Sequence, residues 1–161
     1  MNSLSAARGL TFNAVARSPR PHGRFLAGDV GELAGVTGNT IGQWARWGYI
    51  RSSQSDGEPR VYSVEDIAEA TVVSELLARG VCHADVRRAV ARLADYGTWP
   101  LSDAPLGTIA DGGRPRIVLH ERDGIYELVA RGWQLMAAPP QVEDVRVRLH
   151  RAPGDGARLD G

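Results

Sequence analysis

Four polar residues in the first third of this 161-residue chain have side chains suited to contacting a nucleic acid. They are Asn39, Thr40, Gln43 and Arg46. Amide, hydroxyl and guanidinium groups on an exposed helix are the types that reach base edges and phosphates in the major groove of DNA. Further along the chain, Arg51 and Arg60 could neutralise phosphates of the DNA backbone. We therefore predict a DNA-contacting surface made of Thr37, Asn39, Thr40, Gln43, Arg46, Arg51, Arg60 and Tyr62.

Two short helices joined by a tight turn would position these side chains. Apolar residues recur at steps of three and four, the period of one helix face, in each segment. They are Val30, Leu33 and Ala34 in the first segment and Ile41, Trp44 and Ala45 in the second. Gly35 marks the turn between them, and Thr37 is a good N-cap for the second helix. The pattern predicts a helix-turn-helix, with Trp44 as a core residue.

A hairpin wing and two more helices are expected next. Gly48 ends the second helix, and Tyr49 and Ile50 return to the core. The polar residues 51–59 and the short alternating strand at 60–62 then predict the wing. Ser63 caps a helix that runs to Gly80, and an amphipathic helix follows from Cys82 to Tyr96.

The sequence pattern changes after Gly97, where a small β module is expected. Residues 98–115 are rich in Gly, Pro and Asp and predict a loop or linker. Alternating apolar runs at 117–120 and 125–129 flank Asp123 and Gly124, which is a strong hairpin signal. Further strands are predicted at 133–136 and 145–149. The fold class is therefore α+β: an arm at 1–24, a winged helix-turn-helix at 25–97, a β module at 98–150 and a disordered tail at 151–161.

Composition favours a cytoplasmic protein with an uneven charge distribution. The chain has 19 basic and 19 acidic residues, and residues 1–60 hold seven of the former and four of the latter. All 19 basic residues are Arg, which fits a GC-rich genome as well as recognition. A single cysteine, the lack of an apolar run of about 18 residues and the lack of a signal-peptide pattern favour the cytoplasm. The arm contributes Arg8, Arg17, Arg20 and Arg24, which could lie along phosphates or simply be solvated.

Residues 25–96 resemble the DNA-binding domain of the MerR family of bacterial regulators and its excisionase-like relatives. The matching pieces are VGELAGVTGNTIGQWARWGYI, EPRVYSVEDI and ARGVCHADVRRAV. The resemblance implies that the second helix enters the major groove and that an Arg and a Tyr near the end of the wing, here Arg60 and Tyr62, contact the backbone. In the second helix, members of the family often carry the run Arg-Tyr-Tyr. This chain departs from that pattern, because it has Gly42, Gln43 and Trp44 at these positions. It also lacks the sustained heptads of the dimerisation coiled coil after Tyr96.

The C-terminal part is similar, more loosely, to helix-turn-helix antitoxins that are paired with PIN-domain ribonuclease toxins. The shared pieces are a Pro-Leu, an Asp-Gly-Gly-Arg and a Gly-Trp-Gln-Leu. The resemblance implies a repressor of its own operon whose β module binds a toxin. Candidate partner-binding residues are Trp99, Leu101, Trp133, Leu135 and Met136, which could equally form the core of the module.

Enzyme and metal sites have little support in the sequence, and no cofactor is expected. Cys82 is the one cysteine, and four scattered histidines do not give the ligand spacing of a metal site. The acidic residues Glu121, Asp123, Glu143 and Asp144 fall in predicted turns without a nucleophile or phosphate-binding loop nearby. Cys82 is interpreted as a helix cap.

We therefore expect a sequence-specific DNA-binding transcriptional regulator, a homodimer that acts as an autorepressing antitoxin. Two alternatives remain open. One is a protein-interaction module whose winged helix does not bind DNA, which the Gly42 departure motivates. The other is a ligand-responsive MerR-like regulator, which would need a pocket between the helices and the hairpin.

Overall fold

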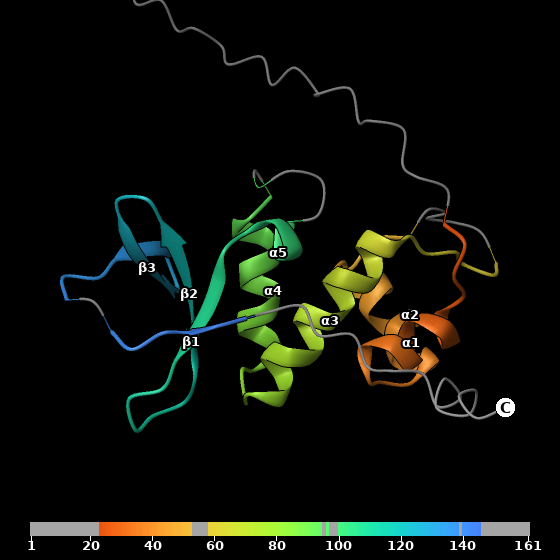
Figure 1. Cartoon of the computed structure of the whole chain (residues 1–161), viewed down its shortest axis with the longest axis horizontal. Helices are drawn as coiled ribbons and strands as arrows, with labels where there is room; N and C mark the ends of the chain where they lie inside the picture. The colour runs from red at the N-terminus through yellow and green to blue at the C-terminus, as the bar shows by residue number, and fades with distance from the viewer. Residues whose placement is uncertain (1–22, 53–57, 95, 97–99, 139, 146–161) are drawn as a thin grey trace, which may run out of the picture.

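The computed structural model describes residues 23–52, 58–94, 96, 100–138 and 140–145 (Figure 1). Its helices are α1 (Ala27–Ala34), α2 (Gly38–Trp47), α3 (Val64–Ala78), α4 (His83–Arg92) and α5 (Pro100–Asp103). Its strands are β1 (Leu106–Ile109), β2 (Arg116–Glu121), β3 (Gly124–Val129), β4 (Gly132–Leu135) and β5 (Glu143–Asp144). The predicted arm up to residue 22, the wing tip at 53–57 and the tail at 151–161 lie outside the described residues. The α+β fold class is confirmed.

The predicted helix-turn-helix is confirmed in α1 and α2. Gly35 follows α1 with a positive φ of 77°, which favours glycine. Gly31 lets α1 approach the turn, because a Cβ there would lie 2.6 Å from the Val36 carbonyl oxygen. Thr37 caps α2 as predicted, since its Oγ1 accepts a hydrogen bond from the Thr40 amide at 3.2 Å.

Helix α3 is the central helix of the molecule. Ser63 and Asp66 form a reciprocal capping box at its start, as the predicted cap requires. Apolar residues such as Ile67, Val73 and Leu76 are buried around α3 rather than along one stripe, which is typical of a helix covered on most sides. In Figure 1, α3 and α4 lie between the α1–α2 pair and the sheet.

The wing is built differently from the prediction. Tyr62 forms an antiparallel bridge with Phe25, with backbone hydrogen bonds of 2.8 and 3.1 Å, and not with the other flank of the loop. Residues 49–52 form no strand in the structure. The segment that precedes α1 therefore supplies the partner for Tyr62 and ties the start of the domain to the start of α3.

The region predicted as a linker contains a helix and a strand. Helix α4 ends at Arg92 instead of Tyr96, and α5 and β1 lie within residues 98–115. The Gly and Pro content concealed them, although Pro suits the first position of a helix. Leu101 in α5 and all four residues of β1 are buried, so packing stabilises these short elements.

One five-stranded antiparallel sheet follows, in the order β4-β3-β2-β1-β5. The β2–β3 hairpin is confirmed, but Glu121 pairs with Gly124, so Arg122 and Asp123 form the turn. The strand predicted at 133–136 corresponds to β4. The strand predicted at 145–149 is not seen at Val145, where β5 has already ended, and residues 146–149 lie outside the described residues.

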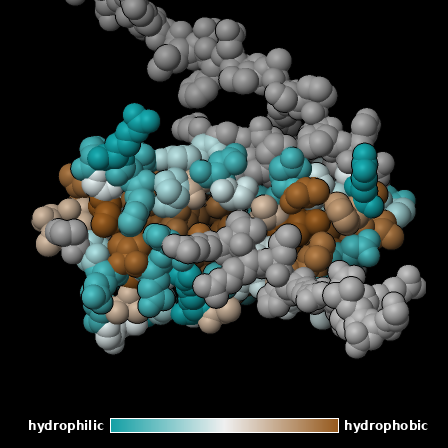
Figure 2. Space-filling view, viewed as in Figure 1, coloured by the Kyte–Doolittle hydropathy of each residue, from teal (hydrophilic) through white to brown (hydrophobic). Residues whose placement is uncertain are grey.

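A continuous hydrophobic cluster joins the helices to the sheet. Leu76, Leu93 and Leu101 from the helical side pack with Ile117 and Leu119 of β2. Figure 2 shows that hydrophobic residues also reach the surface between hydrophilic ones on the viewed face. In the described part of the chain, no helix is both long and apolar enough to cross a membrane.

Candidate nucleic-acid interface

The exposed face of α2 presents three of the predicted DNA-contacting side chains together. Asn39, Gln43 and Arg46 are all exposed, and their spacing of four and three residues places them on one helix face. The opposite face is fixed in the core by Ile41 and Trp44, which confirms Trp44 as a core residue. The helix is thereby held with its polar side outward.

Thr37 and Thr40 contribute to the start of α2 in a different way. Their hydroxyl oxygens lie 2.9 Å apart, and Thr37 also accepts the Thr40 amide hydrogen bond. Thr37 is exposed and Thr40 is half-buried. Both hydroxyls are thus engaged in capping, and they fix the backbone beside Asn39.

Gly42 lies next to the Arg46 guanidinium, at a distance that would also admit a Cβ. Nη1 of Arg46 lies 3.7 Å from the position that a Cβ on Gly42 would occupy. The side chain of Arg46 therefore lies back along α2 toward Gly42. A glycine here costs about 1 kcal/mol of helix propensity, and in this structure it borders the guanidinium.

Arg46 and Arg60 come from separate segments but approach the same phenol ring. Burial raises the pKa of Tyr62 above its usual value, while the positive charges of Arg60 and, more weakly, Arg46 oppose that rise. Both guanidinium groups are therefore close enough to Tyr62 to act on it electrostatically. The positive charges of Arg46 and Arg60, from α2 and from the end of the wing, thus act on the same buried ring.

Tyr62 itself is not available as a phosphate contact in this structure. Its side chain is 0% exposed, and its hydroxyl has no hydrogen-bond partner among the described residues. The bridge to Phe25 and the packing at the start of α3 direct the ring inward. The predicted contact through Tyr62 is therefore at odds with its position, and we assign the ring to the core.

Arg51 is half-buried and its charge acts on a buried acid, Glu69. Glu69 is 2% exposed, and burial raises its pKa to about 8. The amides of Ser102 and Leu101, which donate to Oε1 at 3.3 and 3.0 Å, and the charge of Arg51 oppose that rise. Glu69 thus caps α5 from α3, an arrangement that the sequence pattern did not predict.

Comparisons with known proteins agree with the geometry of α1–α4. Residues 26–93 match the model of the MerR HTH family of regulatory proteins. Residues 26–93 form a MerR-type helix-turn-helix domain. Uncharacterized HTH-type transcriptional regulators of Mycobacterium bovis and Mycobacterium tuberculosis are each 33% identical over 79 residues, which is 47% of this chain. The chain spans only about a third (35%) of the length of these curated relatives, and no solved structure matches it significantly.

An aromatic cluster at the end of α2 was not predicted. Trp47 is 46% exposed and lies with its ring centroid 5.6 Å from those of both Tyr49 and His83. The Tyr49 hydroxyl donates to the His83 backbone carbonyl at 3.1 Å. The cluster fastens α2 to the start of α4 in the MerR-type domain. Its sequence signal is a tryptophan next to Arg46 that falls off the apolar stripe.

The four of the five candidate partner-binding residues that the structure describes differ in exposure. Leu101 is buried, so it is a core residue and not a surface for a partner. Trp133 is half-buried and its Nε1 lies 3.5 Å from the Arg92 carbonyl oxygen. Leu135 is exposed and Met136 is half-buried, while Trp99 lies outside the described residues.

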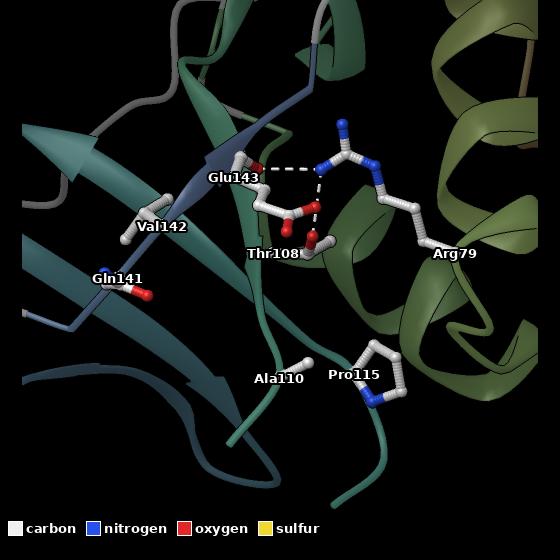
Figure 3. Close-up of a pocket in the computed structure, with 7 residues that line it drawn as sticks. All are labelled: Arg79, Thr108, Ala110, Pro115, Gln141, Val142 and Glu143. Atoms are coloured by element: carbon white, nitrogen blue, oxygen red, sulfur yellow. Dashed lines mark hydrogen bonds between the residues drawn. The ribbon is translucent and has the colours of Figure 1, made fainter. Parts of the chain in front are cut away.

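A pocket of about 560 Å³ lies between the end of α3 and the β1–β5 side of the sheet (Figure 3). Arg79 projects from α3 and donates to Thr108 Oγ1 at 2.9 Å and to the backbone oxygens of Glu143 and Asp144 at 2.7 and 2.8 Å. Its Nε donates to Glu75 at 3.0 Å. The polar groups of this pocket are thus largely engaged with one another, and they fasten β5 to α3.

Cys82 is the residue before α4, where its side chain makes no capping hydrogen bond. Within the described ranges, no three His, Cys, Asp or Glu side chains are grouped as metal ligands would be.

Proposed function

We propose that this chain is a DNA-binding transcriptional regulator and that α2 of its MerR-type domain enters the major groove. The observation that carries the proposal is the exposed set Asn39, Gln43 and Arg46 on one face of α2. Arg60, whose charge acts on Tyr62 as that of Arg46 does, adds a second cation. The names of the mycobacterial relatives, which are HTH-type transcriptional regulators, support the same function.

Each side chain has a distinct role in this proposal. Asn39 and Gln43 carry amides that can pair with base edges, so they would supply sequence preference. Arg46 and the half-buried Arg60 would neutralise phosphates and add affinity without preference. Arg51, whose side chain is half-buried, would add to this neutralisation of phosphates. Catalysis has no part in this function.

The experiment uses the full chain and duplexes selected from a random pool, with binding followed by fluorescence anisotropy at several salt concentrations. Arg60→Ala should weaken all sequences alike and lower the salt slope by about one. Gln43→Ala should reduce discrimination between selected and random duplexes by about 1–3 kcal/mol. Arg122→Ala, which removes an exposed arginine from the β2–β3 turn, is the matched control and should bind as the wild type does.

Two results would reject the proposal. One is a lack of binding to every duplex at about 50 mM salt, where phosphate contacts are strong. That result would favour a helix-turn-helix reused for protein interaction. The other is an equal loss of affinity in Arg122→Ala and Arg60→Ala, which would indicate nonspecific attraction to the whole surface.

We also infer a more specific role, an antitoxin that represses its own operon and binds a PIN-domain ribonuclease toxin. Its support is the resemblance of the C-terminal region, whose Gly-Trp-Gln-Leu forms β4. The test is whether the chain binds its own upstream DNA and co-purifies with the product of an adjacent gene. Binding to distant promoters with no adjacent ribonuclease gene would leave a regulator that is not an antitoxin.

A further inference from the structure

The two edges of the sheet differ in how their backbone groups are used. At the β5 edge, Arg79 binds the carbonyl oxygens of Glu143 and Asp144, and both residues carry a negative charge. At the other edge, β4 contains no charged residue and no proline. Exposed edges are usually protected by charges, prolines or bulges, because an unprotected edge pairs with another strand. The four residues of β4 itself carry none of these three features, and the nearest charge is that of Arg131, directly before the strand.

The register of the β3–β4 hairpin shows which backbone groups of β4 face outward. Val129 pairs with Gly132 across a two-residue turn, and the Met136 amide donates to the Ile125 carbonyl at 2.9 Å. Hydrogen-bonded and non-hydrogen-bonded pairs alternate in an antiparallel ladder. The backbone groups of Trp133 and Leu135 therefore point away from β3. In the described part of the chain, no strand pairs with β4 on that side.

The side chains of β4 add an apolar contact surface at this edge. Leu135 is 54% exposed, although its Cδ1 lies close to Gly124. Trp133, two residues earlier on the same face of the strand, is half-buried against the end of α4. Gln134 points to the opposite face and is exposed.

We propose that β4 is a self-association edge, at which two copies of this chain pair antiparallel around Gln134 and join their sheets into one. In this register, Trp133 of one copy and Leu135 of the second copy form a hydrogen-bonded pair, in which each amide donates to the other residue's carbonyl oxygen. Leu135 of the first copy and Trp133 of the second copy form the same kind of pair. Gln134 of one copy lies directly opposite Gln134 of the second copy. The two form a non-hydrogen-bonded pair, in which side chains approach most closely. Its amide both donates and accepts, so it complements itself.

The pairing also places the exposed apolar surface and the charges favourably. Leu135 is covered by the second copy's Trp133, because directly opposite residues share a face. Arg131 lies opposite the second copy's Ala137, so no like charges meet along the strand. Glu127, the neighbour of Gln134 on β3, has its charge compensated by Arg116 at 2.6 Å. This association does not depend on DNA binding, and it gives the expected homodimer a defined surface.

The first test measures the mass of the full chain without DNA, by light scattering after size exclusion and by sedimentation over a range of concentrations. The wild type is expected to be a dimer. Gln134→Lys places two ammonium groups opposite each other and should weaken dimerisation by more than about tenfold. Gln141→Lys makes the same change at an exposed residue near β5 and should leave the dimer intact.

The second test locates the contact. Gln134→Cys in a Cys82→Ser background should form an intermolecular disulfide on oxidation. Cβ atoms of a non-hydrogen-bonded pair lie at or below the short end of the range of about 4.5–5.5 Å for opposite residues, close to the roughly 3.5–4.5 Å that a disulfide needs. Gln141→Cys in the same background should not. A wild type that stays monomeric at its highest soluble concentration overturns the proposal and leaves the edge to another partner. A dimer that Gln134→Lys does not weaken, with no faster crosslinking at 134 than at 141, overturns it as well.

Discussion

Replacing Glu69 by glutamine should change how the stability of this protein depends on pH. Glu69 is buried between α3 and α5, and its Oε1 accepts hydrogen bonds from the amides of Leu101 and Ser102. Glutamine keeps an oxygen acceptor at nearly the same position and never becomes charged. Glu69→Gln therefore mimics the protonated acid while preserving the cap of α5.

The sign and size of the effect follow from the pKa of Glu69. Burial raises that pKa from 4.5 to about 8 in the folded protein. Between these values the folded state holds a proton that the unfolded state has lost, so stability falls as pH rises from about 4.5 and levels off above about 8. At 1.36 kcal/mol for each pH unit, the full effect is on the order of 5 kcal/mol. The contribution is thus fully present at low pH and lost in alkaline solution.

Urea unfolding followed by circular dichroism at pH 5, 6, 7 and 8 measures this effect. The free energy of unfolding of Glu69→Gln, relative to that of the wild type, should rise by several kcal/mol across this range. Glu32→Gln removes an exposed carboxylate from α1 and serves as the control, with a profile parallel to that of the wild type. A constant difference between Glu69→Gln and the wild type from pH 5 to 8 would refute the reasoning.

Three further changes test particular contacts. Tyr62→Phe removes a buried hydroxyl that has no hydrogen-bond partner among the described residues. The free energy of unfolding should therefore stay within about 1 kcal/mol of that of the wild type, and DNA affinity should not fall. A large loss of DNA affinity would instead support a phosphate contact by the Tyr62 hydroxyl. Arg79→Lys removes the two-nitrogen guanidinium contact to the carbonyl oxygens of Glu143 and Asp144. The free energy of unfolding should fall by about 1–3 kcal/mol, and hydrogen exchange at the Val145 amide should become faster. Unchanged exchange at Val145 would contradict the role of Arg79 in holding β5. Ser63→Ala removes the hydrogen bond that caps α3 and should cost about 1 kcal/mol in thermal unfolding, whereas Ser63→Gly, which suits the N-cap backbone better, should cost a few tenths. No loss of stability in Ser63→Ala would argue against the capping bond.

Local signals were sufficient to predict the helix-turn-helix. Gly35 and Gly48 end α1 and α2 with positive φ, and Thr37 and Ser63 begin α2 and α3 with side-chain caps. These effects depend on a few neighbouring residues, so they can be read from sequence. The β2–β3 hairpin was predictable for the same reason, because alternation and a short polar turn are also local.

Long-range packing decided the features that the sequence pattern missed. Tyr62 pairs with Phe25, 37 positions earlier, and nothing near the wing indicates that partner. Helix α5 is four residues long, lies in a Gly- and Pro-rich segment and depends on Glu69 from α3 for its cap. No local sequence pattern therefore indicates this helix. Arg79 likewise uses β5 carbonyls that are 64 and 65 positions away. Such contacts exist only once the sheet has packed against the helices.

Amide chemical shifts of the isotopically labelled full chain, titrated with a selected duplex at low salt, test the central claim most directly. The account predicts the largest shift changes at Asn39, Gln43 and Arg46 on α2 and at Arg60, with little change at Arg122 in the β2–β3 turn. Changes confined to the sheet, or no changes at saturating duplex, would contradict the assignment of α2 as the DNA-reading helix.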